Sequence, residues 1–155
     1  MKMKTDLMNL QELLNHKLFE VPLNQRGYSW EEQQLNALTE DLRLLTTECL
    51  WVGTVIATTT SSGAPHRYDD DHEPLNHYTL EDGQQRLTAF YLLLQALRER
   101  LEQISGPKAD IEALEKLIYF KEGGLKQARL QNANTKLNQF FQDLLFSRSG
   151  GVTPT

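Results

Sequence analysis

The sequence predicts a small α+β domain in which a mixed sheet is flanked by helices. Its 155 residues, of which 39% are hydrophobic, suit one compact domain with a real core. Leucine stripes at helical spacing alternate with short runs that are rich in β-branched and aromatic residues. The expected order is α-β-α-β-β-α-α-β-α, without an internal repeat, and this order is typical of an α+β domain.

The composition excludes several classes of protein. No apolar run approaches the roughly 20 residues of a membrane span, and the first ten residues lack the apolar core of a signal peptide. A single cysteine, Cys49, excludes an internal disulfide framework. We therefore expect a cytoplasmic protein with no membrane partner. The net charge of -5 argues against a module that binds DNA by charge alone, although a local basic groove is compatible with it.

The first expected elements are a short helix and a short strand. Asp6 is positioned to cap the helix, whose apolar face is formed by Leu7, Leu10, Leu13 and Leu14. The run LFEVPL, residues 18–23, predicts a strand that Pro22 closes, and a polar loop follows.

A second helix and the clearest strand come next. Ser29 and Glu32 form a capping box ahead of an apolar stripe made of Leu35, Leu38, Leu42 and Leu45. WVGTVIATT, residues 51–59, predicts a strand in which Gly53 lets a backbone or a ligand approach closely. Residues 61–76 are acidic and contain Pro and Gly, which predicts an exposed and mobile loop.

The second half of the chain is mainly helical. HYTLED, residues 77–82, predicts a strand, and Gly83 precedes a long helix with Leu87, Phe90, Tyr91, Leu94, Leu97 and Leu101 on its apolar face. A fourth helix is expected over residues 111–120, and ARLQ, residues 128–131, reads as a short strand. A last helix from about residue 132 should bury Leu137, Phe140, Phe141 and Leu144 or Leu145. We assign residues 1–147 to one domain and residues 148–155 to a flexible tail, or a linker to a further C-terminal domain.

The stretch EDGQQR, residues 81–86, stands directly before the long helix. The first N–H groups of a helix lack intrahelical partners and carry the positive end of its dipole, so such a position binds phosphate readily. Gly83 permits close approach, Arg86 adds a planar cationic fork, and Thr88 offers a hydroxyl. The alternative is structural: Asp82 is the N-cap, Gln85 reaches back to it, and Arg86 pairs with Glu81 or Asp82. Spacing alone favours this second interpretation.

A similar group of residues follows the first strand. Gln25, Arg26, Tyr28 and Trp30 combine an amide, a guanidinium and two rings, and a nucleotide needs such groups for its phosphates and base. The alternative is that the two rings pack where the helix begins and Arg26 pairs with a surface carboxylate. Two strand-to-helix junctions with an amide and an arginine make a shared anion site more credible than either one. We therefore expect Arg26 and Arg86 to converge.

A histidine-rich segment, HRYDDDHEPLNH, holds three of the four histidines, His66, His72 and His77, among carboxylates. Imidazoles and carboxylates can bind zinc or manganese, but this spacing matches no metal motif. We expect a solvated loop here, without a structural metal.

Four motifs together resemble a known family. The residues VP, QR and YSW near the N-terminus, then WVGTVI, LEDGQQRLTAFYLLLQAL and ARLQNANTKLNQFFQDLL, are similar to the N-terminal domain of GmrSD-type restriction endonucleases. The resemblance runs from about residue 8 to residue 146, and the DGQQR signature is intact. It implies a ParB/sulfiredoxin-like fold that binds and hydrolyses a nucleoside triphosphate and so regulates cleavage of modified phage DNA. The cutting itself would belong to a separate HNH-type nuclease domain, and no such constellation is visible in this sequence.

The resemblance and the residues together suggest roles for individual side chains. Asp82 would hold Mg²⁺ or position the attacking water, with Gln85 and Arg86 as its catalytic neighbours. The nucleotide would be bound by Gln25, Arg26, Tyr28, Trp30, Gly53, Gly83, Gln84 and Thr88. ATP, GTP and CTP stay equally open. Asn24 stands where the family usually has an aromatic residue, so stacking would fall to Tyr28. Two other functions also stay open: a DNA-binding or nuclease-like ParB-type module, and a non-catalytic interaction domain.

Overall fold

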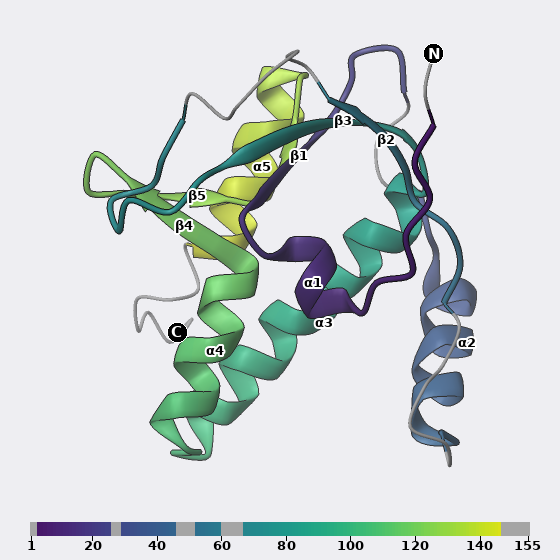
Figure 1. The fold of residues 1–155 in the computed structure, drawn as a ribbon. Helices are drawn as coiled ribbons and strands as arrows, with labels where there is room; N and C mark the ends of the chain where they lie inside the picture. Colours follow the sequence, from purple (N-terminus) through teal and green to yellow (C-terminus); the bar gives the residue numbers. More distant parts are fainter. Residues whose placement is uncertain (1–2, 26–28, 46–51, 60–66, 147–155) are drawn as a thin grey trace.

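The computed structural model describes residues 3–25, 29–45, 52–59 and 67–146. Within them the chain forms an α+β fold, as the sequence predicted (Figure 1). The helices are α1 (Leu10–Leu14), α2 (Glu32–Arg43), α3 (Gln84–Gln103), α4 (Lys108–Ile118) and α5 (Thr135–Phe146). The strands are β1 (Lys17–Val21), β2 (Ile56–Thr59), β3 (Asn76–Asp82), β4 (Tyr119–Glu122), β5 (Leu125–Ala128) and β6 (Leu130–Asn132). The expected tail, residues 148–155, lies outside the described residues.

The main sheet is mixed and has the strand order β2-β3-β1-β6. Strand β1 is parallel to β3 and to β6, with Phe19 opposite both Tyr78 and Leu130. Strand β2 runs antiparallel to β3 at one edge, and β4 and β5 form a separate hairpin. Because the carboxyl ends of parallel strands meet at one edge of a sheet, residues 22–25 after β1 lie near residues 82–86 after β3.

One face of the sheet carries the main core. Figure 1 shows the sheet curving over α1 and α3, and apolar residues from almost every element meet between these layers. The buried members of this core are Leu14, Phe19, Val21, Leu80, Leu87, Tyr91, Leu94, Ile118, Ala128, Leu130 and Leu145. The strand residues alternate in the way a half-buried sheet requires, so Phe19 and Val21 face this core while Leu18 faces away from it.

Most of residues 67–75 are exposed, as predicted, but the segment also contributes a core residue, which the prediction did not include. Leu75 is only 2% exposed and packs with Leu18 and Phe120 on the other side of β1. The Asp70 carboxylate accepts hydrogen bonds from the N–H groups of Gly123 and Gly124, at 2.8 and 2.9 Å, which joins this segment to the β4–β5 turn. The pattern of acids and prolines gave no sign of this partner, because the hairpin is 50 residues further along the chain. His66 lies outside the described residues.

The helix starts differ from the predicted ones. Asn9, not Asp6, caps α1, and it forms the capping box with Glu12. Leu7 is consequently outside the helix and 84% exposed. Helix α2 begins at Glu32, and its capping box joins Glu31 to Gln34. Each observed box needs the same three-residue spacing as the predicted one, so sequence spacing alone could not choose between neighbouring frames.

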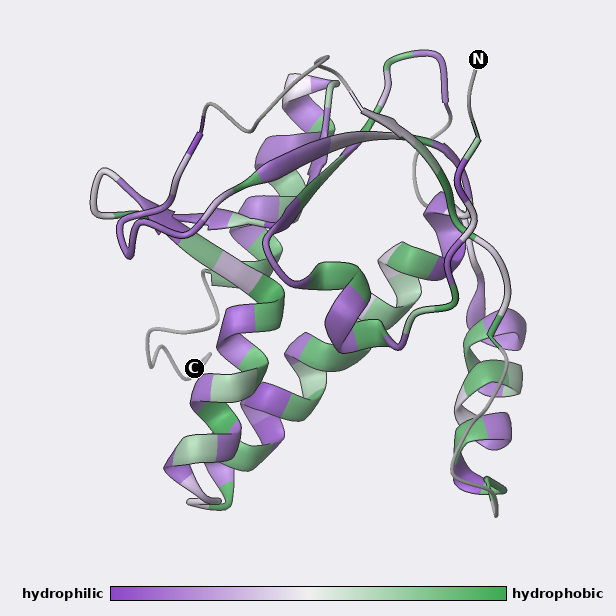
Figure 2. Ribbon diagram, viewed as in Figure 1, coloured by the Kyte–Doolittle hydropathy of each residue, from purple (hydrophilic) through white to green (hydrophobic). Residues whose placement is uncertain are grey.

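Two apolar stripes are also shifted from the predicted ones. On α3, Leu97 is 47% exposed, while Arg98 is buried and pairs with Glu115 of α4 at 2.9 Å. On α5, Leu145 is the buried residue, and Leu137 and Phe140 are exposed. Helix α2 buries no residue, although hydrophobic positions recur along it (Figure 2). Amphipathic spacing therefore located the helices but not the depth at which each one packs.

Two predicted strands and one predicted helix also differ from their expected extents. Strand β2 covers only Ile56–Thr59, because Gly53 with φ +116° turns the backbone before it. The fourth helix ends at Ile118, and the next four residues form β4. ARLQ falls on both sides of the break between β5 and β6. Among the described residues, no helix is long and apolar enough to cross a membrane.

Candidate functional site

A cavity of about 280 Å³ opens where β3 meets α3, at the carboxyl edge of the two parallel strands. It is lined by Gln25, Trp30, Glu81, Asp82, Gly83, Gln84, Gln85 and Arg86. The structure thus brings the two predicted strand-to-helix junctions together at one site. Arg26 and Tyr28 lie outside the described residues, so the expected convergence of Arg26 and Arg86 stays a prediction.

The turn between β3 and α3 depends on Gly83. Its φ of +89° is left-handed, and a Cβ built on it would lie 2.8 Å from the carbonyl oxygen of Thr54. Gly83 is itself the N-cap, and the first backbone bond of α3 runs from the Leu87 N–H to the Gly83 carbonyl at 3.0 Å. The amino end of a helix of 20 residues therefore faces the cavity with the positive end of its dipole.

The cap interpretation of the sequence is wrong in its details. The Asp82 carboxylate accepts the N–H of the adjacent Gly83 at 2.8 Å, and the N-cap of α3 is Gly83, which has no side chain to cap it. The Gln85 amide oxygen accepts the backbone N–H of Ser29 at 2.7 Å instead of reaching back to residue 82. Only one carboxylate oxygen of Asp82 accepts the Gly83 N–H, so the second oxygen could bind a metal ion or a water.

Gln25 connects the two sides of the cavity. Its side-chain amide donates to the carbonyl oxygens of Leu80 and Glu81, at 2.8 and 3.2 Å. Together with the Ser29–Gln85 bond, these bonds hold Gln25 and Ser29 against the end of β3 and the start of α3. The glutamines that the sequence singled out thus build the cavity wall.

Arg86 is the positive group of this site. Its guanidinium makes no ion pair or hydrogen bond with any residue that the structure describes, while the neighbouring Glu81 carboxylate accepts the Thr58 hydroxyl at 3.2 Å. The guanidinium lies against the backbone of Gly53, since a Cβ there would come within 2.6 Å of its Cζ atom. A half-buried cation without a carboxylate beside a polar cavity is a suitable partner for an anion.

Thr88 and the predicted metal site were the remaining expectations for this region. The Thr88 hydroxyl donates to the Gln84 carbonyl at 2.7 Å, within its own helix, and Thr88 does not line the cavity. No group of three or more His, Cys, Asp or Glu residues suited to a metal occurs in the described part of the chain. Mg²⁺ commonly uses only one or two carboxylates together with phosphate and water oxygens, and the Asp82 side chain fits that donor set.

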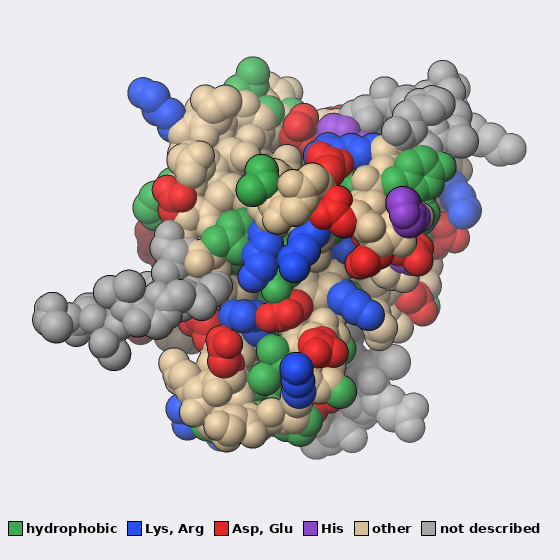
Figure 3. Space-filling view, turned by 90° about the vertical axis from the view of Figure 1, so that its left-hand side faces the viewer, with side chains coloured by type: hydrophobic (Ala, Val, Ile, Leu, Met, Phe, Trp, Pro, Cys, Tyr) green, Lys and Arg blue, Asp and Glu red, His purple; other side chains and the backbone are tan. Residues whose placement is uncertain are grey.

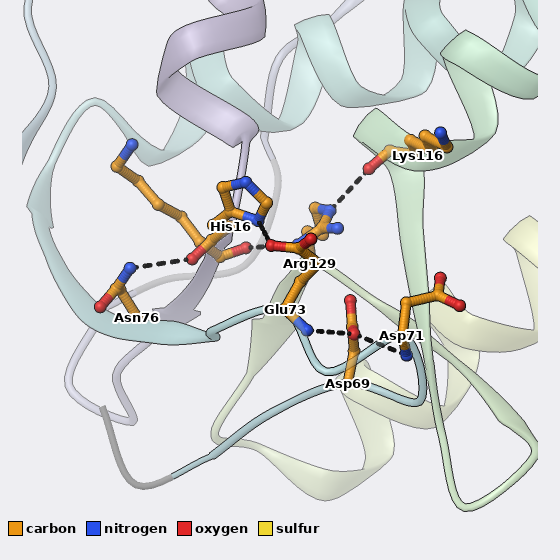
Figure 4. A network of polar contacts seen from close by, with 8 residues as sticks. His16, Asp69, Asp71, Glu73, Asn76, Lys116 and Arg129 are labelled. Atoms are coloured by element: carbon orange, nitrogen blue, oxygen red, sulfur yellow. Dashed lines mark hydrogen bonds and ion pairs between the residues drawn. The ribbon is translucent and has the colours of Figure 1, made fainter. Parts of the chain in front are cut away.

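A second polar cluster surrounds Arg129 at the opposite end of β1, and Figure 4 shows its contacts. The Arg129 guanidinium donates to the carbonyl oxygens of Lys116 and Lys17, at 2.8 and 3.3 Å, and lies over the ring of Phe120. Arg129 is only 5% exposed, and this burial lowers the pKa of its guanidinium. Because its contacts are made within the protein, this arginine is structural.

The surface beside this second cluster carries both positive and negative side chains. Figure 3 shows basic and acidic side chains interspersed over that face. Arg67 pairs with Glu122 through two hydrogen bonds, at 2.6 and 2.8 Å, which hold the pKa of Glu122 below its ordinary range. Such a face does not provide the one-sided basic patch that DNA binding by charge requires.

Comparison with known families gives a match over nearly the whole chain. The family model described as "GmrSD restriction endonuclease, N-terminal domain" matches residues 10–150. Comparison with curated proteins finds no match. The matched range includes every residue that lines the cavity, so the cavity belongs to the shared domain.

Proposed function

We propose, on the premise that this chain belongs to the family of GmrSD restriction endonuclease N-terminal domains, that its cavity binds a nucleoside triphosphate. Binding would regulate restriction of modified DNA by the protein that carries the domain. The observation that carries this proposal is the Arg86 guanidinium, which has no carboxylate partner in the described residues and lies at the mouth of α3.

The geometry supports the phosphates as the part bound most closely. The helix dipole, the N–H groups of the first turn and Arg86 all favour negative charge at the same place. The cavity, at about 280 Å³, is at the small end of ligand pockets and suits a phosphate chain better than a whole nucleotide. Trp30 in the same lining offers an aromatic surface for the base.

Asp82 and Gln85 support a hydrolytic role for the site. Mg²⁺ would be held by Asp82 and would neutralise charge on the phosphates. The free oxygen of Asp82 could instead position a water for attack. The Gln85 amide oxygen accepts the Ser29 N–H, and this bond fixes the side chain in the lining of the cavity. In this proposal Gln85 orients the water or contacts the phosphate through its amide.

Titration calorimetry on the domain tests the binding proposal. ATP, GTP, CTP and duplex DNA are each added with Mg²⁺ at low and at high salt. We expect saturable binding of at least one triphosphate, and weaker binding of DNA that disappears at high salt. If no triphosphate binds at millimolar concentration, the nucleotide proposal is wrong for this domain. Salt-resistant DNA binding alone would favour the ParB-type DNA-contacting module.

The Asp82→Asn variant tests hydrolysis separately from binding. Asparagine keeps an oxygen for the Gly83 N–H but loses the charge that a metal or a water needs. Triphosphate affinity without Mg²⁺ should stay within about twofold, while phosphate release should fall by at least about tenfold. Glu99→Gln, on the same helix but away from the cavity, is the matched control. Unchanged phosphate release in Asp82→Asn would remove Asp82 from the catalytic group.

A further inference from the structure

The segment before β2, residues 52–55, packs against two residues that line the cavity, Gly83 and Arg86. Gly53 lies so close to Arg86 that a Cβ on it would stand 2.6 Å from Cζ and 3.1 Å from Nε of the guanidinium. Heavy atoms at such distances overlap, so the present place of the guanidinium requires a residue without a side chain at position 53.

In the second contact, the glycine belongs to the turn before α3 and its neighbours belong to the segment before β2. A Cβ on Gly83 would lie 2.8 Å from the carbonyl oxygen of Thr54 and 3.1 Å from Cα of Val55. Residues 53–55 and residues 83–86 therefore approach each other at two glycines. This double contact fixes both the turn that opens the cavity and the arginine that charges it.

We infer that Gly53 is a positioning residue of the anion site, which holds the Arg86 guanidinium against its own backbone and aims it at the cavity. The inference rests on the proposed function. It adds a residue that lies about 30 positions upstream of the signature and acts only through Arg86. Gly53 is not among the residues that line the cavity, so this inference gives it an indirect role, whereas the sequence suggested direct contact with the ligand.

Two effects of a side chain at position 53 have to be separated. The φ of +116° is unfavourable for any L-residue, so Gly53→Ala also destabilises the local backbone. Gly124 is a suitable control because its φ is +77° and a Cβ on it would meet nothing within 4 Å. Gly124→Ala thus tests a left-handed position without a crowded neighbour.

The placement of the guanidinium can be measured without any ligand. In the wild-type domain, NMR should show an Overhauser contact between the Hα protons of Gly53 and Hε of Arg86. The Arg86 Nε–H resonance should shift in Gly53→Ala and stay in place in Gly124→Ala. A wild-type protein without that contact, or a Gly53→Ala protein with an unmoved resonance, overturns the inference. The wild-type measurement decides the matter even if Gly53→Ala does not fold.

Binding of inorganic tripolyphosphate and of ATP then tests the consequence. Gly53→Ala should weaken both by about tenfold, which approaches the effect of Arg86→Ala. In the Arg86→Ala background the same change should alter affinity by less than about twofold, because its target is gone. An equal loss in both backgrounds would show that Gly53 acts on the site independently of Arg86, and would overturn the inference.

The two proposals fail in different ways. A wild-type domain that binds neither tripolyphosphate nor a triphosphate contradicts the nucleotide function, whereas the NMR contact still supports the positioning of Arg86 by Gly53. A domain that binds triphosphate without that contact keeps its function and loses the role of Gly53.

Discussion

Arg86 and Arg129 lie at opposite ends of the β1–β3 strand pair and have contrasting environments. Arg129 is 5% exposed and donates to two backbone carbonyl groups, so its guanidinium is buried in contacts within the fold. Arg86 is half-buried and has neither an ion pair nor a hydrogen bond among the described residues. The comparison teaches that the contacts around an arginine, and not its burial alone, distinguish a structural group from a binding group.

The largest expected effect is on stability, at Arg129. Arg129→Ala leaves the carbonyl oxygens of Lys116 and Lys17 without their donor and removes the contact with Phe120. The free energy of unfolding should fall by about 3 kcal/mol in urea denaturation. Arg129→Met, which keeps much of the packing volume, should lose slightly less. A loss under about 1 kcal/mol would mean that the buried guanidinium is not the structural group described above.

The second effect, at Arg86, should be on ligand binding and not on stability. Arg86→Ala should weaken triphosphate binding by about 1.5–3 kcal/mol, the loss of one charge-assisted hydrogen bond, and leave unfolding within about 0.5 kcal/mol of wild type. Calorimetry and denaturation measure the two values. Arg100→Ala, at an exposed position of the same helix, is the control and should change neither. If Arg86→Ala lowers stability and leaves binding unchanged, Arg86 is a structural group like Arg129 and the proposed contrast is wrong.

A smaller effect is expected at Gln25, which ties the wall of the cavity to β3. Gln25→Ala removes the donor to the Leu80 and Glu81 carbonyl groups and should cost about 1 kcal/mol of stability. It should also weaken triphosphate binding, because this side of the cavity loses its fixed contact with the end of β3. Gln33→Ala, exposed on α2, serves as the comparison. Full binding in Gln25→Ala would limit Gln25 to a structural role.

The smallest effect is a pH dependence beside the second cluster. Arg67 lowers the folded-state pKa of Glu122 through their hydrogen bonds, so this pair stabilises the fold above the unfolded-state pKa of about 4.3. That contribution is lost as the pH falls through the folded pKa. Because the side chains of Arg67 and Glu122 are 43% and 37% exposed, this contribution should stay under about 1 kcal/mol. Melting curves from pH 7 to pH 3 should converge for wild type and Glu122→Gln. A constant difference in melting temperature over this range would contradict the assignment.

Local patterns predicted the elements of the site better than its contacts. The strand before Gly83 and the helix after it follow from sequence period and from the glycine, and both are where they were expected. The Gln25–Leu80 and Ser29–Gln85 bonds join residues more than 50 positions apart, and no local pattern encodes such partners. Local spacing could suggest only nearby partners for Arg86, so it favoured a salt bridge with Glu81 or Asp82, which the structure does not form.

By itself, the sequence determined the α+β class, the family resemblance and the position of a polar turn before a long helix. These depend on backbone propensity, hydrophobic period and a short motif, all of which act over a few neighbouring residues. Only the tertiary structure decided that Leu75 is buried, that Arg129 donates to backbone carbonyl groups, and that Arg86 lies against Gly53. Each of these depends on which distant backbone fills the space beside a side chain, and that is settled by strand pairing and packing across the whole sheet.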